Sequence, residues 1–237
     1  PFSGLPVIAY YLCLKNACKT KVILDGSGLD EALSGYEKYF NSKFNFKSNF
    51  IRGQDGSKSV ISNIIHKRLN KEFINIENEI EHPFNNSFNN SKYLDFFYLK
   101  LPRALRFRDK ISMSIGKEIR PSFLNDDLIF SFFKLEKKYQ VKNGLGKYIL
   151  REIYQNDIGK KIAFTKKRNI QTPQTTWFNG SLDKWVSNFL HNSNIWDYKL
   201  VDKTNFFKNY ELFKKGKLKN SFFIWKLINL DLWLNNF

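Results

Sequence analysis

The chain has 237 residues, 42% of them hydrophobic, which suffices for one sizeable domain or two small ones. Its two cysteines, Cys13 and Cys18, match neither a disulfide framework nor a zinc site, so we expect a reduced, cytoplasmic setting. The formal charge of +17 permits a polyanionic partner. Because the lysines are scattered rather than gathered into one run, we interpret most of them as solvated surface residues, and a nucleic-acid partner is not favoured.

The sequence also argues against membrane insertion and secretion. A membrane span needs about 18 uninterrupted apolar residues, and no stretch reaches that length. The candidate Phe222–Leu234 is interrupted by Lys226 and Asp231. The first residues lack the basic segment and cleavage site of a signal peptide. They also lack an initiator methionine, so we expect the chain to be an N-terminally truncated piece of a longer protein.

The first elements expected along the chain are a helix, a strand and a second helix. Leu5–Cys18 is apolar on most sides and predicts a helix with Pro6 in its first turn. Lys21–Asp25 is a short β-branched run that ends at glycines, which is typical of a buried strand in a parallel sheet. The loop Asp25–Asp30 then leads into a helix expected over Glu31–Phe40. In α/β sheets, ligands bind at this kind of junction.

The rest of the chain is predicted to be mainly helical. Phe40–Gly56 has no clear period, Ser57–Asn70 has apolar residues at helical spacing, and Glu81–Ser91 and Thr165–Pro173 are expected to be loops. Further helices are predicted over Tyr93–Leu101, Ala104–Gly116, Asp126–Leu135, Lys147–Gln155, a segment with Leu182, Trp185, Val186, Phe189 and Leu190 on one face, and Asn220–Leu234. We therefore predict one α/β domain over residues 1–237, in which residues 1–40 end a nucleotide-binding sheet and residues 41–237 are mainly helical.

Four short segments carry residues suited to chemistry, and the first is the loop after the predicted strand. Gly26 and Gly28, on either side of Ser27, would let backbone amides approach an anion closely. Asp30 could hold a Mg²⁺ ion on phosphate oxygens. The structural alternative is an ordinary strand-to-helix turn in which Asp30 caps the helix.

The second and third segments lie in the middle of the chain. Glu118 and Arg120 would face one cleft if their stretch is extended, or would form a structural ion pair. The third segment is a Gly-rich turn that opens a helix. Lys147 in its first turn is unfavourable for the helix dipole, which makes an anion partner plausible, although a structural hinge is the alternative. The apolar positions of this helix, including Ile153, are expected to face the core.

The fourth segment is the basic loop that contains Lys167 and ends at Pro173. A lysine on a loop suits the leaving pyrophosphate of a nucleotide, because its ammonium group can neutralise charge that develops there. A solvated basic loop is the alternative interpretation.

In this order, the four segments resemble the synthetase domain of glutamine-hydrolysing asparagine synthetases, a PP-loop ATP pyrophosphatase fold, over nearly the whole chain. The matching residues are Gly26, Gly28, Asp30, Glu31, Gly35 and Tyr36 in the first block, Asp109, Ser112, Met113, Glu118, Arg120, Phe123 and Leu124 in the second, Gly146–Glu152 in the third, and Lys167, Pro173 and Trp177 in the fourth. The resemblance implies that the chain is the C-terminal part of a domain with a Rossmann-like parallel sheet.

The resemblance also implies an ATP-dependent ligase that forms an amide in two half-reactions. A carboxylate, of aspartate or an analogue, attacks the α-phosphorus of ATP, which gives an acyl-adenylate and Mg²⁺-pyrophosphate. Ammonia from a glutaminase domain then displaces AMP. The site residues so implied are Asp25, Glu118, Arg120 and Lys167 for catalysis, and Gly26, Ser27, Gly28, Asp30 and Lys147 for ATP, with Asp30 also holding Mg²⁺.

The sequence departs from the family pattern at several positions. The family's Glu between the two glycines is Ser27, so either Asp25 substitutes for it or the acceptor differs. Asn125 replaces an Asp, while Asn169 and Ile170 stand where Gly and Phe are usual. Neither the Ser-Gly-Gly-x-Asp-Ser pyrophosphate loop nor an N-terminal cysteine nucleophile occurs in these residues. We therefore expect an upstream PP-loop segment and a glutaminase domain as missing partners, and an inactive isolated chain.

Two other interpretations stay open at this point. A basic nucleic-acid-binding module would bind with a steep salt dependence and would ignore ATP. A degenerate, non-catalytic relative is permitted by Ser27 and Asn125. The ligase interpretation requires that Asp30 and Lys167 converge on the same phosphate chain.

Overall fold

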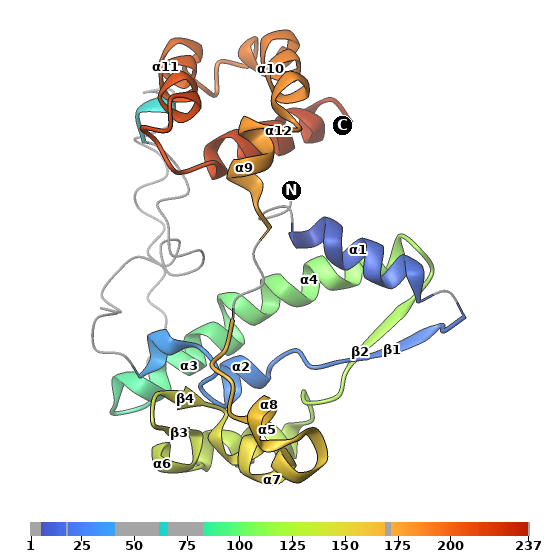
Figure 1. The fold of residues 1–237 in the computed structure, drawn as a ribbon, viewed down its shortest axis with the longest axis vertical. Coiled ribbons are helices and arrows are strands. Elements are labelled where there is room, and N and C mark those ends of the chain that lie inside the picture. The colour runs from blue at the N-terminus through green and yellow to red at the C-terminus, as the bar shows by residue number, and fades with distance from the viewer. Residues whose placement is uncertain (1–5, 18, 41–61, 66–82, 169–171, 237) are drawn as a thin grey trace. The chain divides into compact units, whose positions relative to one another are not determined.

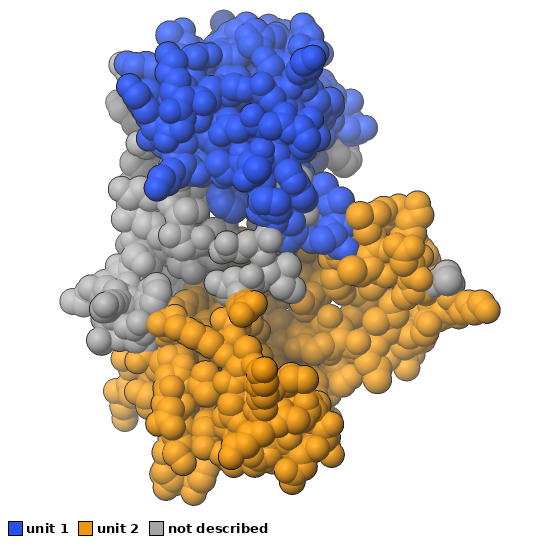
Figure 2. All heavy atoms as spheres, viewed as in Figure 1, with its two compact units in different colours: residues 1–9, 49–79, 170–237 blue, residues 10–48, 80–169 orange. Residues whose placement is uncertain are grey.

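The computed structural model describes residues 6–17, 19–40, 62–65, 83–168 and 172–236. The chain forms two compact units, which Figure 2 colours separately. Residues 10–48 and 80–169 form one of them, called the sheet unit below, and residues 1–9, 49–79 and 170–237 form the other, called the helical unit. Each has its own cluster of buried apolar side chains. The division at residue 40 expected from the sequence stays a prediction.

The sheet unit contains a short parallel sheet (Figure 1). Strand β1 (Val22–Asp25) pairs in parallel with β2 (Glu118–Pro121). The facing pairs are Val22 with Glu118, Ile23 with Ile119, Leu24 with Arg120 and Asp25 with Pro121. The predicted strand and its parallel pairing are confirmed, and with the surrounding helices they make an α/β arrangement. Burial of this strand was wrongly predicted: Leu24 is 73% exposed, because within the described residues β1 pairs with β2 alone.

The helix predicted at the start of the chain is confirmed as α1 (Pro6–Asn16). Leu14 is buried, whereas Ile8 and Leu12 are about half exposed. The turn between α1 and β1 is held by the buried Lys117, whose ammonium group donates to the carbonyls of Ala17 and Thr20.

The helix predicted over Glu31–Phe40 is wrong. The chain instead makes one helical turn, α2 (Leu29–Ala32), then a reversal, and then the 3₁₀ helix η1 (Glu37–Tyr39). Ser34 has a φ of 57°, and a side chain at Gly35 would lie 1.9 Å from Oδ1 of Asp30. The helix therefore ends where the backbone turns back onto its own first turn.

The next helices cover the sheet unit's core. The first two begin earlier than predicted, and the third begins at Asp126 as predicted. These are α3 (Ser87–Phe97), α4 (Lys100–Met113) and α5 (Asp126–Lys134). The loop predicted to reach Ser91 ends at Asn86, because the Asn86 side chain accepts a hydrogen bond from the Asn89 amide and caps α3. Asn125 caps α5 in the same way, through the amide of Leu128. The core residues are Ala32, Phe96 and Leu101, with Leu105, Leu124, Ile129, Phe132 and Phe133 packed against them.

A buried amide ties these helices together. The side-chain oxygen of Gln140 accepts hydrogen bonds from Nζ of Lys92 at 2.7 Å and from Oγ of Ser34 at 3.0 Å. Its nitrogen donates to the carbonyls of Leu135 at 2.6 Å and Phe132 at 3.3 Å. All four hydrogen-bonding positions of this amide are thus filled, which is what a fully buried glutamine needs.

The sheet unit ends with a short helix, a β-hairpin and two further helices. In chain order its elements are α6 (Lys137–Gln140), β3 (Val141–Lys142), β4 (Leu145–Gly146), α7 (Tyr148–Ile158) and α8 (Lys160–Ala163). Strands β3 and β4 pair antiparallel. The helix predicted to start at Lys147 starts one residue later, and Ile153 was wrongly predicted to face the core, since it is 57% exposed.

In the described part of the helical unit, four helices pack around one apolar core. They are α9 (Gln174–Asn179), α10 (Asp183–Asn192), α11 (Lys203–Lys214) and α12 (Phe222–Leu234), with the 3₁₀ helices η2 (Ser62–Ile64) and η3 (Asn194–Trp196) beside them (Figure 1). The predicted helices at α10 and α12 are confirmed. Val186 and Leu190 are fully buried as expected, but Trp185 is 50% exposed.

Some sequence predictions fall on residues outside the described ranges. All of Phe40–Gly56 except Phe40 and most of Ser57–Asn70 belong to this group; the described part of the latter is η2 and an antiparallel bridge between Ile65 and Val201. The described parts of the predicted loop Thr165–Pro173 form no helix or strand. Among the described helices, none has the length and apolarity required to cross a membrane.

Lys92 should make the stability of the protein depend on pH. Burial lowers the pKa of Lys92 to about 7, because its contacts are the Gln140 amide and the rings of Phe88 and Phe133. An unfolded lysine keeps its proton up to about pH 10. Stability should therefore rise between about pH 7 and pH 10, and Lys92→Met should remove this rise in urea denaturation. Lys134→Met, at an exposed lysine, is the control, and equal pH dependence in all three proteins would contradict the assignment.

Candidate functional site

The structure brings together Asp30, Lys147 and Lys167, three residues predicted from the sequence. The Lys167 ammonium group donates to Oδ2 of Asp30 at 2.6 Å, although the two residues are 137 positions apart. Nζ of Lys147 lies 2.8 Å from Oδ1 of the same carboxylate. All three side chains are partly buried, between 22% and 30% exposed. Two cations from different segments thus share one anion.

Lys147 reaches this place because the hairpin packs against the turn after α2. A side chain at Gly146 would lie 1.8 Å from the carbonyl oxygen of Ser34, so only glycine permits the contact. The Lys147 amide donates to the carbonyl of Leu33 at 2.9 Å. Lys147 itself has a φ of 56° and precedes the first residue of α7. Its left-handed backbone directs the side chain to Asp30 instead of along the helix.

The segment that carries Lys167 is held by Arg151, which sequence reasoning did not select as a functional residue. The Arg151 guanidinium donates to the carbonyls of Gly146 at 2.7 Å, Ala163 at 2.5 Å and Thr165 at 2.9 Å. One side chain therefore joins the hairpin, the end of α8 and the loop before Lys167. The available signal was the position of Arg151 inside the third matched block.

The Asp30 carboxylate stays ionised in this setting. Burial acts to raise the pKa of Asp30, but the charge and hydrogen bonds of Lys147 and Lys167 outweigh it and hold the pKa below its ordinary value. The cluster therefore carries two positive charges and one negative charge at neutral pH. Such an arrangement favours an anion that replaces Asp30 as the partner of the lysines.

A second layer of polar residues lies next to this cluster, and sequence reasoning assigned it no role. The Tyr36 hydroxyl donates to Oε1 of Glu31 at 2.9 Å. Burial raises the pKa of Glu31, and the hydrogen bond from Tyr36 opposes this only in part. Burial also lowers the pKa of Lys100, whose Nζ lies 3.4 Å from the centre of the Tyr36 ring. Lys167 lies 5.1 Å from the same ring centre.

Asp25 and Ser27 belong to a separate group of contacts. Oδ1 of Asp25 accepts hydrogen bonds from the Ser27 amide at 2.8 Å, from the Ser27 hydroxyl, and from Nη1 of Arg108 at 2.9 Å. The guanidinium of Arg108 also lies 5.6 Å from the centre of the Tyr10 ring. In the described part of the chain, none of these contacts reaches Asp30. Asp25 therefore fixes the turn that follows β1.

The other predicted residues lie on more open parts of the sheet unit. Glu118 and Arg120 are on β2, so their stretch is extended as required, and they pair with each other at 2.7 Å. Both side chains are more than half exposed. Gly26 is exposed, whereas Gly28 is buried and has a φ of 94°, a conformation that favours glycine.

The described residues suit a Mg²⁺ ion that binds together with a nucleotide. They are less suited to holding Mg²⁺ by themselves. Among them, no group of three or more His, Cys, Asp or Glu side chains is placed to hold a metal. Mg²⁺ is commonly bound by one or two carboxylates together with substrate phosphates. Asp30 can supply a ligand of that kind here.

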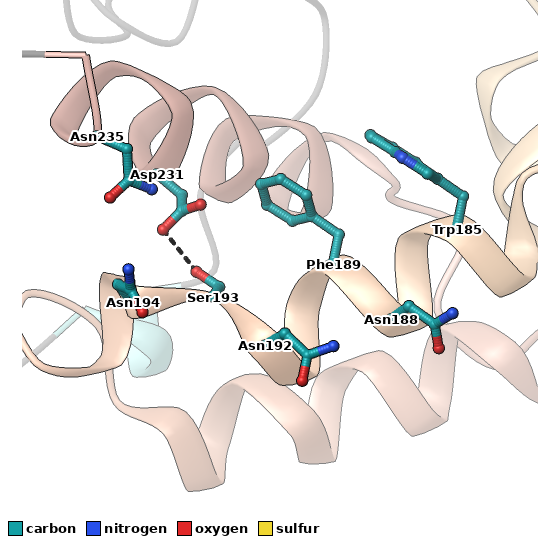
Figure 3. Close-up of a pocket in the computed structure, with 8 residues that line it drawn as sticks. All are labelled: Trp185, Asn188, Phe189, Asn192, Ser193, Asn194, Asp231 and Asn235. Atoms are coloured by element: carbon teal, nitrogen blue, oxygen red, sulfur yellow. Dashed lines mark hydrogen bonds between the residues drawn. The ribbon is translucent and has the colours of Figure 1, made fainter.

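A hollow of about 330 Å³ lies in the helical unit between α10 and α12 (Figure 3). Trp185 and Phe189 line it together with asparagine side chains and Asp231, whose Oδ1 accepts a hydrogen bond from Ser193 at 2.7 Å. It contains none of the residues predicted for the site.

Residues 1–235 match the protein family described as asparagine synthase, and the chain therefore belongs to the asparagine synthase family. Over 145 residues it is 25% identical to asparagine synthetase (glutamine-hydrolyzing) 1 of Bacillus subtilis (strain 168). That stretch covers 61% of this chain and 23% of the Bacillus protein, so the chain spans about a quarter of this relative. No solved structure matched the chain. The family expected from the motifs is thus confirmed.

Gly146 should be far less tolerant of a side chain than Gly26. Gly146→Ala places its Cβ against the Ser34 backbone, whereas a Cβ at Gly26 meets nothing within 4 Å. We expect Gly146→Ala to lower the free energy of unfolding by about 1–3 kcal/mol, as overpacked substitutions do. Gly26→Ala should change it by less than about 1 kcal/mol. Urea denaturation of both variants checks this, and equal midpoints would show that the contact does not constrain the hairpin.

Proposed function

We propose that this chain supplies the lysine side of the polyphosphate site in an ATP-dependent, AMP-forming amide ligase. The observation that carries the proposal is the meeting of Lys147 and Lys167 on the Asp30 carboxylate. The match to the asparagine synthase family supports the reaction class. The Bacillus relative, named as a glutamine-hydrolysing asparagine synthetase, supports aspartate or an analogue as the carboxylate substrate.

In the first half-reaction, a carboxylate oxygen of the substrate bonds to the α-phosphorus of ATP. The bond between this phosphorus and the oxygen that bridges it to the β-phosphorus breaks. Negative charge then develops on the departing pyrophosphate. Lys167 and Lys147 can exchange Asp30 for this anion and neutralise it as it forms. Groups aimed in advance at developing charge in this way typically change rates by about 10²–10³-fold each. In the second half-reaction, ammonia attacks the acyl carbon, AMP leaves, and the attacking nitrogen loses a proton to give the amide.

Mg²⁺, when bound with the nucleotide, would supply further charge neutralisation, and Asp30 is the residue we propose to hold it. The glycine turn of Gly26 and Gly28 is proposed to present backbone amides to the phosphates. Asp25 remains our candidate for the residue that substitutes for the family's Glu at position 27. Its hydrogen bonds with Ser27 and Arg108 indicate that it would act together with them.

We further propose that the nucleotide site is completed by polypeptide outside this chain. Leu24 on β1 is 73% exposed, which is unusual for a parallel strand, and Glu118 and Arg120 on β2 face solvent. Additional strands of a Rossmann-like sheet, with a pyrophosphate loop, would cover these residues. A glutaminase domain is the proposed source of ammonia. The isolated chain should then release no pyrophosphate from ATP, and its doing so would contradict this division.

Pyrophosphate binding tests the lysine pair directly. We expect isothermal titration of the chain with inorganic pyrophosphate to show binding that weakens about ten-fold or more in Lys147→Ala and in Lys167→Ala, because each loses a charge-assisted contact. Lys134→Ala, at an exposed lysine on α5, is the matched control for net charge. Equal affinity of all four proteins would show that these lysines do not form the site.

The same titration separates the two roles proposed for Asp30. Without Mg²⁺, Asp30→Asn should bind pyrophosphate more tightly, since both ammonium groups are freed from their carboxylate. With Mg²⁺, it should bind more weakly than the unchanged protein, since the ion loses an oxygen ligand. Tighter binding under both conditions would exclude Asp30 as the metal ligand, and weaker binding under both would contradict its competition with the anion.

A further inference from the structure

We propose that Tyr36 is a positioning residue whose aromatic ring holds the ammonium groups of Lys167 and Lys100 for a polyphosphate ligand. This inference rests on the proposed function and gives a role to two residues. Tyr36 belongs to the first matched block but had no role assigned there, and Lys100 lies outside the matched blocks. The inference begins from one observation: two lysines from distant segments approach the same ring.

The ring is within the range of a cation–π contact for both lysines. Nζ of Lys100, from the first turn of α4, lies 3.4 Å from the ring centre. Nζ of Lys167 lies 5.1 Å from it. Contacts of this kind act up to about 6 Å and strengthen when water is excluded. Tyr36 therefore contributes attraction to two cations without contributing a negative charge that would compete with an anion.

The orientation of the ring is set from the other end of the side chain. The Tyr36 hydroxyl donates to the Glu31 carboxylate at 2.9 Å, and Glu31 is only 4% exposed. Glu31 lies in α2, one residue after Asp30. The ring that contacts Lys167 and the carboxylate that pairs with Lys167 are thus fixed to the same helical turn.

Lys167 needs such a support because its own segment has no regular structure. The described residues 165–168 form neither helix nor strand. Among the described residues, the Lys167 ammonium group contacts the Asp30 carboxylate and the Tyr36 ring. When an anion displaces Asp30, the ring contact persists, because a neutral ring does not repel the anion as a carboxylate does. Tyr36 would then keep Lys167 in place during the exchange.

Two substitutions separate the ring from the hydroxyl. Tyr36→Phe and Tyr36→Leu both lose the hydrogen bond to Glu31, but only the leucine variant loses the ring. Pyrophosphate affinity should be reduced about five-fold further in Tyr36→Leu than in Tyr36→Phe. The matched control is Tyr139→Leu, since Lys138 lies 4.9 Å from the centre of that exposed ring. It should leave the affinity unchanged.

A second measurement reports on the ring contact without any ligand. In protein with ¹³C-labelled lysine, the ε-methylene signals of Lys100 and Lys167, assigned with the Lys→Arg variants, should be displaced by the ring. The displacement should persist in Tyr36→Phe and vanish in Tyr36→Leu. Unchanged signals in Tyr36→Leu, or equal affinities of the two Tyr36 variants, would overturn the proposal. Displaced signals in a protein that binds no pyrophosphate would overturn the proposed function and the positioning role, while leaving the ring contact intact.

Discussion

The backbone of Gly146 lies against the Ser34 carbonyl with no room for a side chain, and the rest of the sheet unit's site follows from this contact. It places the Lys147 amide on the Leu33 carbonyl and so brings the start of α7 to the end of α2. It also leaves the chain no space to continue α2 as a longer helix. A close approach of two backbone segments is thus the reason that Lys147 reaches Asp30.

Around this contact, one carboxylate is shared by two lysines, and our proposal is that an external anion replaces it. Asp30 neutralises part of the charge of two lysines, which lowers the cost of holding them together in a partly buried place. A polyphosphate offers the same lysines more negative charge than a single carboxylate can. The buried Glu31, the residue after Asp30, accepts a hydrogen bond from the Tyr36 hydroxyl. The arrangement is consistent with the family to which the chain belongs.

Two departures from the family pattern make local contacts of their own in the structure. Ser27, which replaces a Glu of the family, makes its hydrogen bonds to Asp25, and Asp25 in turn pairs with Arg108. This substitution is therefore accommodated by a self-contained polar group. Asn125 has a structural role as the cap of α5, which an aspartate would fill equally well. Neither departure disturbs the lysines at Asp30.

Sequence alone was sufficient where a signal is contained within a few neighbouring residues. The strand at Val22–Asp25 and the helices α5 and α12 were predicted in this way, whereas the site roles of Asp30, Lys147 and Lys167 stay predictions. It was insufficient for Glu31–Phe40. The helical periodicity there does not show that Gly146 packs against Ser34, where the predicted helix would continue.

The sequence by itself determined the family, because short motifs in a fixed order carry it. It also named the residues that we propose to hold a phosphate. Only the tertiary structure decided which of these residues meet. It joined Lys167 to Asp30 and Tyr36, tied their segment down with Arg151, and left Asp25, Glu118 and Arg120 in other surroundings. The physical reason is that contacts between residues more than a hundred positions apart depend on close packing of the backbone, which leaves no periodic trace in the sequence.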